Sequence, residues 1–135
     1  MKVENGKLIK VTDDDIVNGT FDFPEGITEI GYGAFSDCTS LESINISEGI
    51  TIINEDTFYN CINLKYVKLP ESITRIDEDA FAQCYNLEEI NIPESVTEIH
   101  NDSFMLCESL NESIKNKIVT INSNARFKYR TVYIP

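Results

Sequence analysis

The residues whose chemistry stands out are four cysteines that recur at a fixed spacing: Cys38, Cys61, Cys84 and Cys107. Zinc sites use close pairs such as C-x₂₋₄-C, whereas these cysteines are 23 residues apart. If the repeats stack, equivalent side chains run in parallel, so their Cβ atoms do not face each other as a disulfide requires. The spacing therefore predicts four buried free thiols, which behave as small hydrophobic side chains.

His100 is the single histidine of the chain and lies in a variable turn. A cysteine–histidine nucleophile would need Cys107, but that position is filled by cysteine in three other repeats without any histidine. A catalytic residue is expected at a position that differs from the repeat pattern, and Cys107 follows the pattern. Because the chain has one histidine, it cannot form a Ser–His–Asp triad elsewhere. We expect an exposed loop histidine, no catalytic residue and no enzymatic activity.

Acidic residues align in one turn of successive repeats, at Glu55–Asp56, Asp77–Asp79 and Asp102. Calcium binds several oxygen ligands, so a calcium site is one interpretation of this alignment. The sequence has neither the EF-hand spacing nor a glycine–aspartate nonapeptide repeat. The pattern favours a solvated acidic ridge, and we expect neither a metal ion nor a cofactor.

The charge balance is strongly acidic, with 11 Lys and Arg against 23 Asp and Glu, a formal net charge of −12. Residues 27–110 hold 16 of the acidic residues and only 3 basic ones. Nucleic-acid grooves need clustered cations, and so does adhesion to an anionic membrane. No apolar run approaches the about 18 residues of a membrane-spanning helix. Nucleic acid and membrane insertion are therefore not expected.

Many positions besides cysteine repeat at the same offset of 23 residues. The clearest rows are Phe35, Phe58, Phe81 and Phe104; Leu41, Leu64, Leu87 and Leu110; and the Ile-Thr-x-Ile segments that begin at Ile27, Ile50, Ile73 and Val96. Helical-hairpin repeats need about 33–47 residues, whereas leucine-rich repeats use about 20–29. One coil cannot bury its apolar residues alone, but stacked coils bury them against each other, which predicts a solenoid.

Within one coil, Leu41, Ile44 and Ile46 are apolar and their neighbours are polar, which predicts a short strand with one face inward. The Ile-Thr-x-Ile segment returns along the opposite wall, and Ala34–Cys38 is expected to form one helical or 3₁₀ turn. The fold class is thus an α/β-type repeat solenoid. It has a short parallel sheet of one strand per coil, short helical or 3₁₀ turns, and caps at both ends.

We expect a single domain, residues 1–135, with an N-terminal cap at 1–26, four repeats at 27–110 and a C-terminal cap at 111–135. Asp13–Asp15 should open a short helix in the first cap. The spacing of Leu110, Ile114 and Ile118 predicts an amphipathic helix after Asn111. Residues 119–135 resemble a degenerate fifth coil, with a closing strand at 126–133. This cap should also cover Met105 and Leu106. Otherwise the two residues belong to a second candidate docking surface, which consists of apolar residues at positions that are polar in other repeats: Tyr32, Ile52, Tyr59, Ile62, Tyr85, Met105 and Leu106.

These residues resemble the BspA-type leucine-rich repeat, whose pattern is A-F-x-x-C-x-x-L-x-x-I-x-I-P-x-x-I-x-x-I. Residues 80–99 fit it almost throughout, from Ala80-Phe81 through Ile92-Pro93 to Ile99. The resemblance implies a curved solenoid that binds other molecules. It also implies kinship with bacterial surface adhesins and host-interaction proteins.

The strand residues that point away from the core are the candidate partner-binding surface, and Tyr66 is its best single anchor. These residues are Asp22, Ser43, Asn45, Tyr66, Lys68, Glu89 and Asn91. We predict a non-enzymatic protein–protein interaction scaffold, monomeric, which binds a protein partner in a bacterial host-interaction or effector role. The alternative is a surface-adhesion or self-assembling module. Free cysteines and the lack of a classical signal peptide favour the cytosol, with a surface or secreted location as the alternative.

Overall fold

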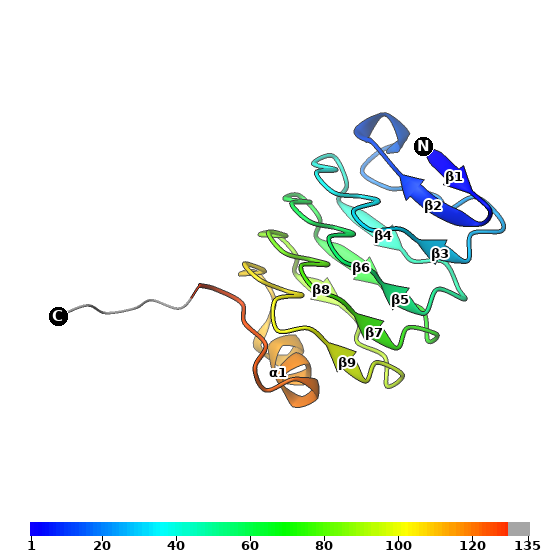
Figure 1. The fold of residues 1–135 in the computed structure, drawn as a ribbon. Helices are drawn as coiled ribbons and strands as arrows, with labels where there is room; N and C mark the ends of the chain where they lie inside the picture. The colour runs from blue at the N-terminus through cyan, green and yellow to red at the C-terminus, as the bar shows by residue number, and fades with distance from the viewer. Residues whose placement is uncertain (130–135) are drawn as a thin grey trace.

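The computed structural model describes residues 1–129, which wind into a stack of similar coils (Figure 1). Each middle coil contributes one strand to each of two parallel sheets. One sheet contains β4 (Ser43–Asn45), β6 (Tyr66–Lys68) and β8 (Glu89–Ile90), and the other contains β5 (Ile52–Ile53), β7 (Arg75–Ile76) and β9 (Glu98–Ile99). The pairings join residues 23 apart, such as Ile44 with Val67 and Ile53 with Ile76.

The predicted parallel sheet of one strand per coil is present as β4, β6 and β8, but the prediction is incomplete, because a second sheet runs along the opposite wall. The Ile-Thr-x-Ile segments supply a second strand, because their extended backbone also pairs with the neighbouring coil: the Thr74 amide donates to the Thr51 carbonyl at 2.8 Å. Only two residues of each segment count as a strand. A strand that short leaves almost no alternation in the sequence.

The prediction for Ala34–Cys38 is confirmed in part: Phe35 and Cys38 are buried as expected, but the segment is a turn and not a helix. A 3₁₀ helix needs successive amides that bond three residues back. Here the Cys38 amide does so, to Phe35 at 3.1 Å, but the Phe35 amide donates instead to Thr57 of the next coil, at 2.9 Å. Asp37 ends the turn with a φ of 63°. This wall of the stack is thus a series of turns that bond from coil to coil.

Two positions of the first three turns, and one position of the fourth, adopt left-handed backbone, and most of their residue types reflect this. The φ angle is positive at Asp37, Asn60, Gln83 and Leu106, which are 23 residues apart, and likewise at Gly33, Asp56 and Asp79. Glycine, Asp and Asn enter this region at the lowest cost. The aspartates at positions 56 and 79 therefore have a conformational role, independent of any ligand.

The core is a set of continuous rows along the stack. The rings of Phe35, Phe58, Phe81 and Phe104 are almost fully buried, with centroids 4.9, 5.1 and 5.2 Å apart. The interplanar angles along the row are 17°, 8° and 6°, so the rings are nearly parallel. Regular stacking of identical coils aligns the rings in this way. The 23-residue rows of the sequence thus form a shared interior.

The first coil is covered by a hairpin of β1 (Lys2–Glu4) and β2 (Lys7–Lys10). β2 runs parallel to β3 (Glu29–Ile30) and pairs Leu8 with Ile30, so the hairpin extends the stack by one layer. A 3₁₀ helix, η1, follows at Asp13–Asp15, as predicted. Its Asp15 carboxylate accepts the Thr12 amide at 2.9 Å, which caps the first turn.

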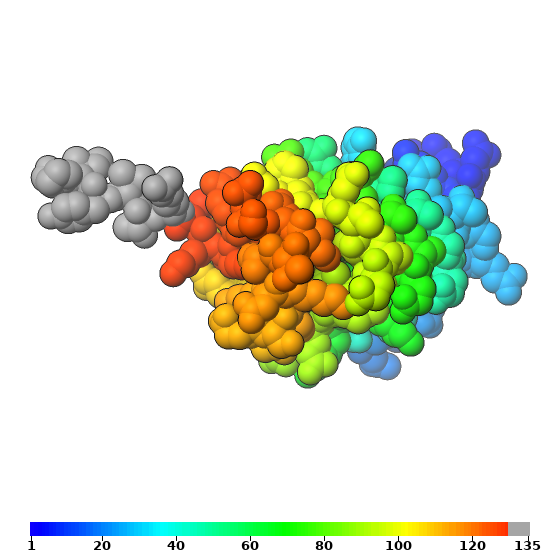
Figure 2. Space-filling view, turned by 90° about the horizontal axis from the view of Figure 1, so that it is seen from below, coloured from blue at the N-terminus to red at the C-terminus, as the bar shows by residue number. Residues whose placement is uncertain are grey.

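The other end is covered by α1 (Glu112–Ile121), shown in orange in Figure 2. The helix begins after Asn111, whose Oδ1 accepts the Ile114 amide at 2.9 Å, and it buries Ile118. The predicted helix is confirmed, although it extends to Ile121 and so includes 119–120, which were assigned to a fifth coil. Within residues 1–129, no helix has the length and apolar character needed to cross a membrane.

Residues 122–127 continue the stack beyond the helix. The Asn122 side chain donates to the Ile99 carbonyl at 2.7 Å, and the Phe127 carbonyl accepts the Leu106 amide at 2.9 Å. Met105 is buried, as expected for a position under the cap. Residues 126–129 do not form the predicted closing strand, and residues 130–133 of that prediction lie outside the described residues.

Candidate binding surface

The outer side of β4, β6 and β8 presents polar side chains, because strand residues alternate between core and solvent. On β6, Val67 is buried, whereas Tyr66 and Lys68 are exposed. Sheet register places Tyr66 beside Ser43 on β4 and beside Glu89 on β8. We call this surface the strand face.

The strand face holds a shallow hollow of about 360 Å³ at its centre. A second hollow of about 330 Å³ adjoins it toward the N-terminus and includes Asp22. Together the two hollows are lined by all seven residues predicted to bind a partner: Asp22, Ser43, Asn45, Tyr66, Lys68, Glu89 and Asn91. The fold thus brings the predicted set together, and its binding role stays a prediction.

Asn91 differs from the other six because its amide is engaged within the protein. Its Oδ1 accepts the Leu69 amide at 2.7 Å, and its Nδ2 donates to the Leu69 carbonyl at 2.9 Å. In the preceding pair of coils, the Ile46 amide donates to the backbone carbonyl of Lys68. At the equivalent position the Leu69 amide donates instead to the Asn91 side chain, which replaces that backbone bond. Asn91 is therefore a structural residue that also borders the hollow.

Tyr66 is nearly half exposed, at 46%. The neighbouring Glu88 carboxylate raises the pKa of the Tyr66 hydroxyl. The hydroxyl is uncharged at physiological pH, as tyrosine ordinarily is, and can donate or accept a hydrogen bond. An aromatic ring with such a group is suited to contacts that combine apolar area with one hydrogen bond.

A third hollow of about 420 Å³ continues the strand face toward α1 and was not predicted. Its lining includes Asn91, Glu94 and Lys117, and Lys117 Nζ lies 3.6 Å from the Glu94 carboxylate. Lys117 belongs to α1, so sequence alternation within the strands could not reveal it. The only indication in the sequence was that Lys117 lies on the polar side of the predicted amphipathic helix.

A larger hollow of about 940 Å³ lies between α1 and residues 126–129, and it is lined by Lys115, Phe127 and Tyr129 among others. Lys115 Nζ lies 5.5 Å from the centre of the Phe127 ring, a cation–π contact that fastens this segment to the helix. None of the seven residues predicted to bind a partner lines this hollow. We therefore place the candidate site on the strand face.

The four cysteines are buried free thiols, as predicted. Each Sγ lies 3.0–3.4 Å from a backbone carbonyl of the preceding coil, and the acceptors for Cys61, Cys84 and Cys107 are the phenylalanines Phe35, Phe58 and Phe81. Burial raises the pKa of Cys38 to about 11 and raises the pKa values of Cys61 and Cys84 well above the usual thiol range. Reactive cysteines need a depressed pKa, so these thiols suit a core and not a nucleophile.

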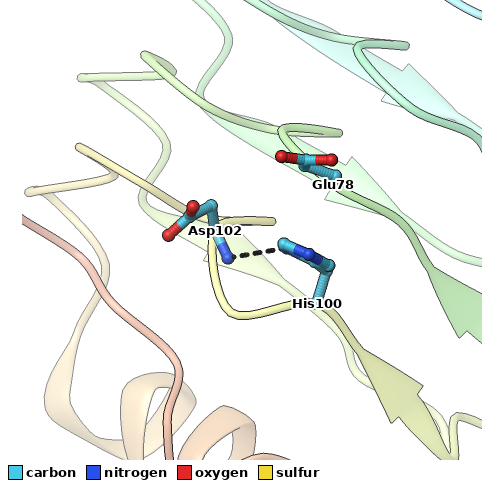
Figure 3. A group of neighbouring side chains, drawn as sticks. All are labelled: Glu78, His100 and Asp102. Carbon is cyan, nitrogen blue, oxygen red and sulfur yellow. Dashed lines mark hydrogen bonds between the residues drawn. The ribbon is translucent and has the colours of Figure 1, made fainter.

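His100 is exposed, as predicted, and lies beside Glu78 and Asp102 (Figure 3). One potential ligand atom from each residue lies within 4.8 Å of the others, close enough for a metal ion. However, His100 Nδ1 accepts the Asp102 amide at 3.1 Å, and Arg126 donates to both Asp102 oxygens at 2.8 Å. A cation would have to compete with this guanidinium, and the expected absence of a metal stays a prediction.

The acidic ridge comprises Glu55, Asp56, Asp77, Glu78, Asp79 and Asp102 on neighbouring turns. Asp77 is paired with Arg75 and Asp102 with Arg126, and the other four have no such partner among the described residues. Burial, followed by repulsion from Glu78, raises the pKa of Glu55 and of Asp56. Burial and then the Asp56 charge raise the pKa of Asp79. These carboxylates repel one another in the folded state, so the ridge destabilises the fold slightly at neutral pH.

Lowering the pH from 7 to about 4.5 is expected to raise Tm by about 1–2 °C. A carboxyl group with a raised folded pKa favours the folded state below its unfolded pKa, and this contribution is lost as the pH rises through the folded pKa. The Asp79→Asn variant should lose part of this rise, whereas Glu25→Gln, on an exposed turn outside the ridge, should retain it. Calorimetry at both pH values measures the effect, and equal rises in the two variants would contradict it.

Comparison with known proteins identifies the family to which these coils belong. A model for the BspA type leucine rich repeat region matches residues 18–132 with six copies. The chain belongs to the BspA-type leucine-rich repeat family. Six family copies extend beyond the four repeats expected at 27–110, into both segments that were assigned as caps. The domain boundaries themselves stay a prediction.

Two solved structures of leucine-rich repeat proteins are similar to this chain in fold. The T. pallidum leucine-rich repeat protein has 26% identity and a TM-score of 0.76, over 83% of this chain and 52% of its own. A leucine-rich cell surface protein from Faecalibacterium prausnitzii has 32% identity and a TM-score of 0.72, over 94% of this chain and 34% of its own. This chain thus spans about half and about a third of their lengths. A comparison with curated protein sequences gives no significant match.

Proposed function

We propose that this BspA-type protein is a non-enzymatic interaction module whose strand face binds a protein partner. The observation that carries the proposal is that most polar side chains of the strand face have no bonding partner within the described part of the protein. Within residues 1–129, the side chains of Asp22, Ser43, Asn45, Lys68 and Glu89 make no hydrogen bond or ion pair to the protein. They surround a hollow and are exposed or half-exposed, so they are available to a ligand.

Tyr66 is the proposed anchor at the centre of this surface. Binding energy in protein interfaces concentrates in a few residues, and tyrosine is enriched among them. Pairing with strands on both sides holds the backbone of Tyr66, and a tyrosine side chain has only two rotatable torsions, so little conformational entropy is lost when it is covered. The core rows provide rigidity, and the variable outer residues provide specificity.

A host-interaction role is the finer form of this proposal. Its support is the family, since the notable structural relatives are bacterial, and one of them is described as a cell surface protein. The same description favours a second candidate function, a module of a surface array. Sedimentation velocity at several concentrations separates the two: the interaction module stays monomeric, whereas a self-assembling module forms larger species as concentration rises.

The Tyr66→Ala and Lys68→Ala variants are expected to reduce the amount of specific partner retained from a host lysate by about tenfold or more. The immobilised full chain serves as bait, and retained proteins are quantified by mass spectrometry. Tyr32→Ala is the matched control, because Tyr32 is 73% exposed and lies outside the strand face.

Thermal stability is measured on the same variants. Loss of a surface contact should leave Tm within about 2 °C of the parent. Retention that is unaffected by Tyr66→Ala, or reduced equally by Tyr32→Ala, would contradict the proposal.

A further inference from the structure

The charges on the strand face follow a fixed order along the stack, and this order restricts which partner can bind. The first coil presents Asp22. Three charged residues, Glu42, Lys65 and Glu88, border the strand face just before β4, β6 and β8, and Lys68 and Glu89 lie on β6 and β8. All six are exposed. These coils are adjacent in space, because the Lys65 amide donates to the Glu42 carbonyl and the Glu88 amide donates to the Lys65 carbonyl.

The two lysines are unusual in this protein. Residues 27–110 contain three basic side chains, and the third, Arg75, is paired with Asp77 at 2.7 Å. Neither Lys65 nor Lys68 has a carboxylate within ion-pair distance among the described residues. Two of the three basic residues in the repeats therefore lie close together, Lys65 just before β6 and Lys68 at its end. Lys65 lies between Glu42 and Glu88 of the adjacent coils, and neither lysine is neutralised by an ion pair among the described residues.

We propose that the strand face recognises an extended peptide segment whose charges run in the order basic, acidic, basic. The proposal rests on the proposed function and specifies the partner's chemistry. The acidic residue meets Lys65 and Lys68, and the two basic residues meet Asp22 or Glu42 on one side and Glu88 or Glu89 on the other. Charge complementarity of this kind selects partners, because a wrong order places like charges together.

The spacing fits an extended chain. Neighbouring strands lie about 4.8 Å apart, so Asp22 and Glu89, on the first and fourth coils, are separated by about 14 Å. In an extended strand, residues i, i+2 and i+4 share one face and span about 13 Å. The lysines of the third coil lie about 10 Å from Asp22 and about 5 Å from Glu89, whereas the peptide charges are about 6.6 Å apart. A segment of the form Lys-x-Asp-x-Lys therefore spans the four coils, and long side chains take up the remaining offset of about 3 Å.

A second copy of this chain is a poor occupant of the same face. A two-fold axis through β6 would place Lys65 and Lys68 of one copy against the same lysines of the other. The acidic coils would also meet acidic coils. The arrangement therefore favours a different chain as the partner.

Two synthetic peptides of equal composition and net charge test the proposal. The matched peptide is acetyl-Thr-Lys-Val-Asp-Val-Lys-Thr-amide, and the reordered peptide is acetyl-Thr-Asp-Val-Lys-Val-Lys-Thr-amide. Each is titrated at low ionic strength into the full ¹⁵N-labelled chain, and affinity is measured from amide shifts. Because each exposed ion pair contributes about a 1.5- to 5-fold change in affinity, we expect the matched peptide to bind at least about threefold more tightly.

The double variant Lys65→Glu, Lys68→Glu should abolish this preference, whereas Lys128→Glu, outside the strand face, should retain it. Equal affinities for the two peptides, a preference that survives in the double variant, or no binding of either peptide up to millimolar concentration would each overturn the proposal. After any of these three outcomes, the lysate experiment with Tyr66→Ala decides what has failed. If Tyr66→Ala still reduces retention of a protein partner, only the proposed charge order is wrong and the proposed interaction function stands.

Discussion

Replacement of Phe58 by alanine is expected to lower the free energy of unfolding by about 3–5 kcal/mol. The ring is fully buried and lies between Phe35 and Phe81, with centroid distances of 4.9 and 5.1 Å. Removing it leaves a cavity that the two neighbouring coils cannot fill, because each is held in register by its own strand pairings. A repeat protein depends on such contacts between nearest-neighbour coils.

Urea denaturation followed by circular dichroism measures this change. The Tyr32→Ala variant is the control, since its side chain is mostly exposed and a change within about 0.5 kcal/mol is expected. Phe81→Ala should match Phe58→Ala, because both rings occupy equivalent places in the row. A loss below about 1 kcal/mol at Phe58 would show that the row is not a packed interior.

Raising the pH above about 8.5 is expected to destabilise the protein steeply. Thiols in an unfolded chain ionise near pH 8.5, whereas burial raises the pKa of Cys38 to about 11 and raises those of Cys61 and Cys84 as well. Between these values the unfolded chain has lost protons that the folded chain retains. The free energy of unfolding should therefore fall by about 1.4 kcal/mol per pH unit for each thiol, or about 4 kcal/mol per unit for three.

The urea midpoint measured at pH 7, 9 and 10 tests this dependence. The stability that the neutral thiols contribute is fully present below pH 8.5 and is lost as the pH rises toward the folded pKa values. The Cys61→Ala variant should show a slope that is smaller by about one third, because one thiol no longer titrates. A midpoint independent of pH between 8.5 and 10 would mean that the thiols are accessible in the folded state.

The repeating core was predictable because every coil imposes the same requirement on the same position. Phe58, Cys61 and Leu64 are each buried in one coil, and each sits in a row that recurs along the stack. A position that is ambiguous in one repeat can therefore be assigned from the equivalent positions of the other repeats. The helix after Asn111 was predictable for a different reason, since its apolar spacing breaks the strand phase.

The turns were not predictable to the same degree, because their backbone bonds are made to neighbouring coils. Nothing in the segment Ala34–Cys38 shows that the Phe35 amide pairs with Thr57. The left-handed positions carried a usable signal at Asp56 and Asp79, since aspartate tolerates that conformation, but Leu106 adopts it without one.

The strand face was predictable as a set of exposed positions, but the partners of its side chains were not. Alternation marks Asn91 as outward, like Lys68, yet its amide bonds to the Leu69 backbone. The hollow beside α1 depends on Lys117, which the strand pattern does not contain. Periodicity therefore indicates which residues face outward, whereas hydrogen bonds decide which of them remain free.

Photo-cross-linking from the strand face tests the proposed interaction most directly. A photoreactive phenylalanine analogue is placed at position 66 in one sample of the full chain and at position 32 in another, and both are illuminated in the same lysate. We predict a discrete covalent adduct with a single partner from position 66 and none from position 32. An adduct from position 32 alone, or the same adducts from both positions, would contradict the assignment of the strand face as the binding surface.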